Sequence, residues 1–237
     1  MGEGLHNDAL LMPLISSANI SCGFHAGDIE TMKRTVELAL QNNVAIGAHP
    51  GFDDKANFGR VEISITLPHL FDIMTEQIHL LKKITDTFGA KIHHIKPHGA
   101  LYNRAARDKI FARTIAASIQ SVDPNYILYG LSGSYLISEA TALNLRTASE
   151  TFADRSYQAD GSLTPRSLPG ALIENTEDSL KQVLQMILQR TVTTPHGETI
   201  PINAETICIH GDGKNAVLFA DQIRKNLIDN KITIQTI

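Results

Sequence analysis

The sequence predicts an α/β fold, namely a single-domain (β/α) barrel of seven or so parallel strands that spans residues 1–237. Short apolar runs alternate with amphipathic helical patterns along the chain, which is typical of βαβ units around a parallel sheet. The 237 residues, 43% of them hydrophobic, suffice for one sizeable core, and α/β barrels often reach this length as one domain. A doubly wound open sheet is the second possibility, but its dinucleotide-binding version has no support, since no predicted strand leads into G-x-G-x-x-G.

The first predicted units follow one another closely. ANIS at 18–21 predicts a strand, and a helix begins near Asp28, a residue type that caps helices well. VAIGA at 44–48 predicts the next strand, and residues from about 68 to 88 predict a long helix with one apolar face. KIHHI at 91–95 predicts a third strand, followed by a helix near 106–121.

The second half continues this alternation. YILYGL at 126–131 and LRTAS at 145–149 predict strands on either side of a helix at 134–144. Residues 151–175, rich in Gly, Pro and Ser, predict an irregular loop inside the domain. The chain is completed by a helix at 176–190, the strand TICIH at 206–210, a helix at 215–229 and a last strand, ITIQTI, at 232–237.

Composition excludes several classes of function. The net charge of −4 and the pI near 6.2 do not indicate a nucleic-acid partner. No apolar run approaches the ~18 residues of a membrane span, and the N-terminal residues lack the pattern of a signal peptide. Cys22 and Cys208 match no zinc or redox spacing, which favours two reduced core residues and a cytoplasmic location.

Polar side chains collect where the predicted strands end. In chain order they are His25, His49, Lys96, His98, Glu150, His210 and Asp212. The carboxyl ends of parallel barrel strands share one face, where such folds build their active sites. We therefore expect these residues to line one pocket, with Lys96 and its i+2 neighbour His98 pointing into it together.

Simpler interpretations compete with a catalytic one. A single histidine after a strand often caps a helix or packs, and we interpret His93 and His94, inside a strand, as structural. Glu3, His25, His49 and His98 are candidate ligands for zinc or manganese, although no H-x-x-x-H or H-E-x-x-H motif is present. HGDGKNA at 210–216 lacks the glycine spacing of a P-loop, so nucleotide binding does not follow from the residues alone.

Several long motifs together resemble the LamB/YcsF family. They are MGEG (1–4), LMPLISSANISCGFHAGD (11–28), VAIGAHPGF (44–52), FGR (58–60), HHIKPHGALYN (93–103), ETFADRSYQADGSLTPRS (150–167) and ICIHGD (207–212). The resemblance runs nearly end to end. It implies a barrel related to the polysaccharide-deacetylase-like fold. It also implies ATP-dependent opening of the lactam 5-oxoproline to L-glutamate, with Mg²⁺ accompanying ATP and with subunits B and C as partners.

Residue types suggest roles in that chemistry. Phosphorylating the amide oxygen and then adding water needs cations, a base for water and an acid for the leaving nitrogen. The candidates are Lys96 with Arg155, Arg60 or Arg166 as cations, Glu150, Asp212 or a histidine as base, and His98 or His49 as acid. Arg155 or Arg166 could hold the substrate carboxylate, and His25, Arg60 and His210 complete the predicted substrate contacts.

Two other functions stay open at this point, and so does homo-oligomerisation. The chain could be a metal-dependent deacetylase or amidohydrolase on the same barrel, or a binding subunit whose partners carry out catalysis. Family members usually place a strand, roughly IDLNCD, before the GEG that stands here at residues 2–4. We therefore expect that this first strand is missing and that the native reading frame extends upstream.

Overall fold

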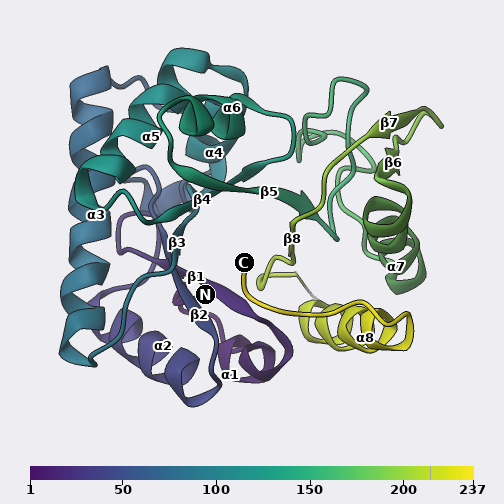
Figure 1. Ribbon diagram of the computed structural model, residues 1–237, viewed down its shortest axis with the longest axis horizontal. Helices are drawn as coiled ribbons and strands as arrows, with labels where there is room; N and C mark the ends of the chain where they lie inside the picture. The colour runs from purple at the N-terminus through teal and green to yellow at the C-terminus, as the bar shows by residue number, and fades with distance from the viewer. Residues whose placement is uncertain (214) are drawn as a thin grey trace.

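The centre of the computed structural model, which describes residues 1–213 and 215–237, is a curled sheet of six parallel strands. They lie side by side in the order β1 (Ser17–Ser21), β2 (Ala45–His49), β3 (His94–Ile95), β4 (Ile127–Leu131), β5 (Arg146–Phe152) and β8 (Thr206–Cys208). Figure 1 shows the sheet curving around an open interior like half of a barrel, with the C-terminus inside the curve. The predicted α/β class and the parallel pairing are confirmed.

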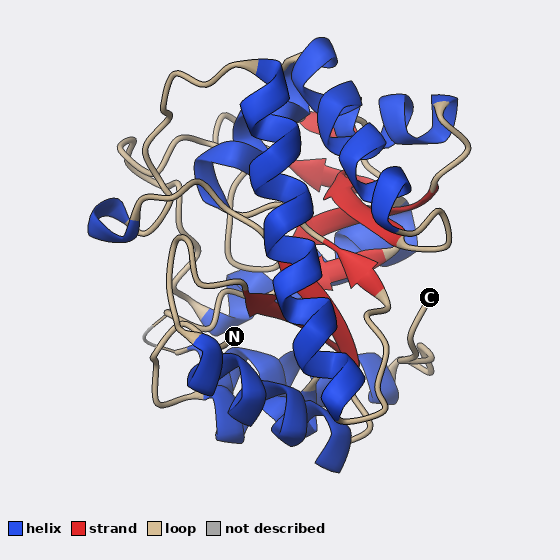
Figure 2. Ribbon diagram, turned by 90° about the vertical axis from the view of Figure 1, so that its left-hand side faces the viewer, coloured by secondary structure: helices blue, strands red, loops and turns tan. Residues whose placement is uncertain are grey.

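Helices cover the outer face of this half-barrel, as Figures 1 and 2 show. They are α2 (Ile29–Gln41), α3 (Leu67–Thr87), α4 (Gly99–Arg107), α5 (Lys109–Val122) and α6 (Tyr135–Ala142). The short α1 (Asp8–Leu11) and the 3-10 turns η1 (Met12–Leu14) and η2 (Lys55–Asn57) lie in the connections. Near the open side, α7 (Thr176–Leu184), which continues into the π-helical turn η3 (Gln185–Gln189), packs on α8 (Ala216–Asp229).

The helix starts follow from local side-chain chemistry. The Asp28 carboxylate accepts a hydrogen bond from the backbone N–H of Thr31 at 2.7 Å, so α2 begins where the sequence predicts. Thr66 caps α3, and Pro68 occupies its first turn, where a missing N–H costs nothing. Leu70, Met74, Ile78 and Leu81 then form the buried stripe of that helix, as their spacing indicates.

A tightly packed layer lies on the concave side of the sheet. The His94 ring stacks on Tyr129 with centroids 4.0 Å apart, and its Nε2 is 2.9 Å from Oδ1 of Asn19. Gly47 lies directly against the same ring, since a Cβ on it would be 2.0 Å from Nε2 of His94. Strands β1 to β4 thus close on one another only because position 47 has no side chain.

Two predictions about the sheet are wrong. Among residues 1–213 and 215–237 the barrel is not closed, and its sheet has six strands in place of about seven. Residues 232–237 form no strand; Ile232, Ile234 and Ile237 line the interior, and the main-chain oxygen of Ile237 accepts a hydrogen bond from His93 at 2.8 Å. Alternating apolar residues suit the wall of a cavity as well as a strand, so periodicity alone could not separate the two.

Other local predictions also need correction. The helix expected near 106–121 is two helices, because Asp108 is extended and its carboxylate caps α5 by accepting from the N–H of Phe111 at 3.0 Å. Residues before the last strand form an unpredicted antiparallel hairpin, β6 (Thr191–Thr193) with β7 (Thr199–Pro201). The other strands and helices differ from prediction by a few residues at their ends, and β3 keeps only two paired residues.

Across the described residues, every helix is too short or too polar to span a bilayer.

Candidate functional site

The carboxyl ends of the strands open into a cavity of about 910 Å³ that extends into the half-barrel. It is lined by most predicted site residues, namely Glu3, His49, Arg60, Lys96, His98, Glu150, Arg155, Arg166, His210 and Asp212. His25 does not line it and lies buried behind the wall, with 1% of its surface exposed. The structure therefore gathers residues that are up to about 200 positions apart in sequence, as expected for a parallel sheet.

One wall of the cavity is a histidine cluster, formed by Glu3, His25, His49 and His98. The rings of His25 and His98 stack with centroids 3.8 Å apart and an interplanar angle of 5°. Nδ1 of His98 is 3.0 Å from Nε2 of His49, and Oε1 of Glu3 is 3.5 Å from Nε2 of His25. These rings fit closely only because of Gly51, where a Cβ would lie 2.6 Å from Nδ1 of His25.

Backbone carbonyls fix the two rings that face the cavity. Nδ1 of His49 is 2.6 Å from the carbonyl oxygen of Lys96, and Nε2 of His98 is 2.8 Å from that of Phe58. Burial lowers the pKa of His49 well below its usual value, and burial with the neighbouring His25 lowers the pKa of His98 to about 3. Both imidazoles are therefore neutral near pH 7.

The carboxylate of this cluster is ionised. Burial alone would raise the pKa of Glu3, but the N-terminal ammonium, 3.8 Å away, and His25 hold it at about 2. Glu3, His49 and His98 each offer one ligand atom, and these three atoms lie within 4.8 Å of one another. Two neutral imidazoles and a carboxylate form a donor set that a divalent metal ion could use.

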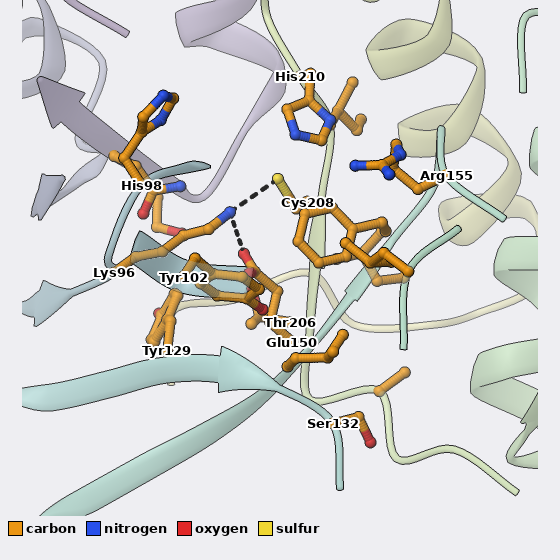
Figure 3. A pocket seen from close by; sticks show the side chains of 18 of the residues that line it. Lys96, His98, Tyr102, Tyr129, Ser132, Glu150, Arg155, Thr206, Cys208 and His210 are labelled. Atoms are coloured by element: carbon orange, nitrogen blue, oxygen red, sulfur yellow. Dashed lines mark hydrogen bonds and ion pairs between the residues drawn. The ribbon is translucent and has the colours of Figure 1, made fainter. Parts of the chain in front are cut away.

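Beside the histidine cluster lies a lysine cluster, formed by Lys96, Tyr102, Glu150 and Cys208 (Figure 3). Nζ of Lys96 lies 2.6 Å from Oε1 of Glu150 and 3.0 Å from Sγ of Cys208. The Lys96 and Glu150 side chains are only 6% and 2% exposed, and the Phe152 ring lies 4.9 Å from the ammonium. This is a buried ion pair in the lining of the cavity.

The ammonium of Lys96 stays charged at neutral pH. Burial opposes the ammonium of Lys96, but Cys208 and the Glu150 carboxylate raise its pKa above the usual value. Burial raises the pKa of Cys208 to about 12, so at neutral pH the carboxylate is the negative partner and the thiol is uncharged. Cys208 is therefore a neutral hydrogen-bond acceptor and a poor nucleophile.

Two polar atoms of the lysine cluster are buried without a hydrogen-bond partner among the described residues. They are Oε2 of Glu150 and Oη of Tyr102. Burial and the nearby Glu150 carboxylate raise the pKa of Tyr102 well above its usual value. Because a buried polar group without a partner costs about 1–3 kcal/mol, these two atoms indicate a place where a bound molecule makes hydrogen bonds.

Arginines stand around the opening of the cavity. Arg60 pairs with Asp212 at 2.5 Å, and Arg166 lies on the long loop that follows β5. Burial and the charge of Arg60 lower the pKa of Arg166, and burial with the charge of Arg166 lowers the pKa of Arg155 to about 10. The three guanidinium groups repel one another, and the carboxylates of Asp154 and Asp212 offset part of this repulsion, which leaves positive charge beside the pocket for an anion.

Two of the predicted site residues have mainly structural contacts. Arg155 is buried, and it donates to the carbonyl oxygens of Thr164 at 2.5 Å and Ala171 at 3.2 Å, so it holds the long loop in place. His210 pairs with Asp154 at 2.9 Å and stacks on Phe152. Asp212, predicted as a base, is already paired with Arg60.

Sequence reasoning missed two members of the lysine cluster. Tyr102 lies one helical turn after His98, and that spacing could have placed it on the same face. Cys208 was predicted to be a core residue, and this prediction is wrong, since it lines the cavity and accepts a hydrogen bond from Lys96. It precedes His210 by two positions, which in a strand puts both on one side. Cys22, in contrast, is fully buried as predicted.

Comparisons with known proteins agree with this architecture. The family model described as LamB/YcsF family matches residues 1–237. The chain is 51% identical over 229 residues to a protein of Shouchella clausii that is named as the A subunit of 5-oxoprolinase, covering 97% of this chain and 90% of that one. It is 46% identical over 240 residues to the protein of the same name from Tolumonas auensis, covering 99% and 96%.

A solved structure shares the same fold. It is the lactam utilization protein of Thermus thermophilus, which superposes with a TM-score of 0.93 at 36% sequence identity and covers 99% of this chain and 94% of that one. The match of the family model over the whole length and the high identity to curated relatives lead to one conclusion: this chain belongs to the LamB/YcsF family.

Proposed function

We propose that this chain is the A subunit of an ATP-dependent 5-oxoprolinase and that it opens the lactam ring of 5-oxo-L-proline to give L-glutamate. The observation that carries the proposal is the lysine cluster, where a fixed ammonium stands beside two buried polar atoms that have no partner among the described residues. The relatives named as A subunits of 5-oxoprolinase and the neighbour named a lactam utilization protein support the choice of a lactam.

Lys96 stabilises the negative charge that develops on the lactam oxygen. Its ammonium is held 2.6 Å from Glu150, so it is positioned before the substrate arrives. A preorganised charge in a site with little water lowers the barrier more than the same charge in solvent, because no reorientation accompanies the reaction. If the lactam oxygen is first phosphorylated, the same ammonium faces the phosphoryl group.

Glu150 transfers a proton from the attacking water to the ring nitrogen. Its Oε2 takes a proton from water as the oxygen of that water bonds to the lactam carbon, and the same oxygen then gives the proton to the ring nitrogen as the C–N bond breaks. The ring protons of His49 and His98 face backbone carbonyls, so these residues have no proton to offer the substrate. We therefore assign the acid step to Glu150 rather than to the two histidines that the sequence suggested.

The arginines at the opening recognise the substrate carboxylate. Arg60 and Arg166 line the cavity, and the pKa of Arg166, lowered by burial and by Arg60, reflects two positive charges close together. The substrate carboxylate would replace Asp212 as the partner of Arg60 and relieve the remaining repulsion with Arg166. Arg155 supports the loop that carries Arg166, so its role is positioning.

ATP supplies the driving force together with partner subunits. An amide is a weak electrophile. Transfer of the γ-phosphoryl group to its oxygen, with Mg²⁺ on the nucleotide, releases ADP and activates the ring carbon. Water then adds to this carbon, the C–N bond breaks to give γ-glutamyl phosphate, and a second water releases L-glutamate and phosphate. The chain has no P-loop spacing, so we assign this phosphorylation to subunits B and C. The chain alone is then expected to give no turnover.

The test is glutamate release by the complex assembled from the chain and its two partner subunits, with 5-oxoproline, ATP and Mg²⁺. Lys96→Met and Glu150→Gln should each lower kcat by at least about a hundredfold. Lys91→Met, the same change at an exposed position before β3, is the matched control and should leave kcat unchanged. Wild-type turnover by both cluster variants would refute the assignment.

The histidine cluster favours one alternative, a metal-dependent amidohydrolase that needs no ATP. This function predicts turnover by the chain alone, without nucleotide, and complete loss on treatment with a chelator. The proposed function predicts turnover only when ATP and both partners are present. Binding of 5-oxoproline without any turnover, even in the full complex, would instead favour a binding role for this chain.

A further inference from the structure

The hydrogen bonds around His49 and His98 fix where their ring protons lie. Nδ1 of His49 is 2.6 Å from the carbonyl oxygen of Lys96, and Nε2 of His98 is 2.8 Å from the carbonyl oxygen of Phe58. A carbonyl oxygen can only accept, so each of these ring nitrogens must carry the proton. A neutral imidazole has one N–H, so the other nitrogen of each ring is a bare lone pair.

These two lone pairs face each other. Nε2 of His49 and Nδ1 of His98 are 3.0 Å apart, which is hydrogen-bond distance, yet neither nitrogen has a proton to share. Two acceptors at this distance repel unless a positive species lies between them. A proton would be shared by these two nitrogens alone, whereas a metal ion can also take the Glu3 carboxylate as a ligand, so a metal ion is the better occupant.

Glu3 supplies a third donor atom beside the two histidine nitrogens. A carboxylate oxygen of Glu3 and one ring nitrogen each of His49 and His98 all lie within 4.8 Å of one another. Nε2 of His25, a ring whose nitrogens have no hydrogen-bond partner among the described residues, lies 3.5 Å from this carboxylate. Metal-binding histidines typically donate their other N–H to a carbonyl or carboxylate, which is the arrangement that Lys96 and Phe58 provide here.

We propose that Nε2 of His49, Nδ1 of His98 and the carboxylate of Glu3 bind one divalent transition-metal ion, with Zn²⁺ as the preferred ion. Two imidazoles and one carboxylate suit Zn²⁺ and its first-row neighbours better than Mg²⁺ or Ca²⁺, which prefer oxygen. With bonds of about 2.0–2.1 Å, tetrahedral Zn²⁺ places two ligand nitrogens about 3.3–3.4 Å apart. The rings therefore need to separate by only a few tenths of an ångström from their 3.0 Å contact.

The remaining coordination position faces the cavity. Glu3, His49 and His98 line it together with Lys96 and Glu150, so a water molecule or a carbonyl oxygen could bind the ion from that side. The ion would act there as a Lewis acid. This inference concerns binding by the chain itself and does not depend on the lactam-opening function.

The test is metal binding by the tag-free full-length chain after dialysis against a chelator and removal of the chelator. Zn²⁺ is titrated by calorimetry, and Co²⁺ is titrated while the visible ligand-field bands are recorded. We expect one ion per chain with a Kd of about 1 μM or tighter. His49→Ala and His98→Ala should remove this binding, and Glu3→Gln should weaken it by about tenfold to a hundredfold.

The matched control is His69→Ala, which removes an exposed histidine of α3 and should leave the Kd unchanged. Circular dichroism and thermal unfolding of each metal-free variant check folding, and Glu3→Gln, outside any helix or strand, serves if a histidine variant does not fold. Binding weaker than about 1 mM by the wild-type chain would overturn the proposal. Binding that is unchanged in the three cluster variants, or lost in His69→Ala, would overturn it as well.

Discussion

Lys96→Met tests whether the buried ion pair determines stability as well as activity. Nζ of Lys96 lies 2.6 Å from Oε1 of Glu150, with both side chains nearly inaccessible. At an effective dielectric constant of about 20 this separation corresponds to an attraction of about 6 kcal/mol, from which the cost of desolvating both groups is subtracted. Breaking one partner of a buried pair typically costs about 3–5 kcal/mol, and we expect that loss of unfolding free energy.

The reason is the carboxylate that remains. Oε2 of Glu150 has no hydrogen-bond partner among the described residues, and without Lys96 its Oε1 faces only the neutral thiol of Cys208. The double variant Lys96→Met/Glu150→Gln removes the charge and should recover at least half of the loss.

The measurement is guanidinium-induced unfolding followed by circular dichroism, with Lys91→Met as the exposed control, expected within about 0.5 kcal/mol of wild type. The reasoning is refuted if Lys96→Met unfolds within about 1 kcal/mol of wild type, or if the double variant is no more stable than the single one.

Three further outcomes are expected. Burial would raise the pKa of Asp154, but its partner His210 lowers that pKa below the ordinary 3.8. The Asp154 carboxylate therefore stabilises the folded chain above pH 3.8, and this stabilisation is lost as the pH falls below that value. Asp154→Asn should therefore flatten the acid limb of the curve of unfolding free energy against pH, and an unchanged limb would contradict this. Gly47→Ala puts a Cβ within 2.0 Å of the His94 ring and should cost about 1–3 kcal/mol in chemical unfolding, unlike Gly211→Ala, whose nearest neighbour is 3.4 Å away; equal losses would count against it. Tyr102→Phe removes a buried hydroxyl that has no partner among the described residues and should leave stability equal or higher while lowering kcat in the complex; lower stability would show that the hydroxyl is already paired.

The fold class was predictable because periodicity reports on burial. Strands from 18–21 to 145–149 and the helix capped by Asp28 appear where the apolar pattern places them. Closure of the barrel was not predictable, because it depends on whether residues 232–237 pair with an edge strand of the sheet. Their alternating apolar and polar side chains suit the wall of the cavity equally well. A helix cap inside a continuous apolar pattern was also not predictable. Asp108 ends α4 and begins α5 without interrupting the helical spacing of the apolar residues.

The location of the site was predictable for a topological reason, while the pairings within it were not. Parallel strands bring His49, Lys96 and Glu150 to one edge whatever their sequence separation. Which side chains meet depends on rotamers and loop paths. Arg155 illustrates this, since its charge and position suggested substrate contact, but its guanidinium donates to carbonyl oxygens of the long loop.

Lys96 links the histidine cluster to the lysine cluster through different atoms. Its carbonyl oxygen accepts the ring proton of His49, which leaves Nε2 of that ring free for a metal ion, while its ammonium pairs with Glu150. A side-chain substitution removes the second contact and keeps the first, because every residue type retains the carbonyl. Lys96→Met should thus abolish turnover and leave Zn²⁺ affinity near that of wild type. Loss of both would mean that the ammonium, and not the backbone, holds the histidine cluster together.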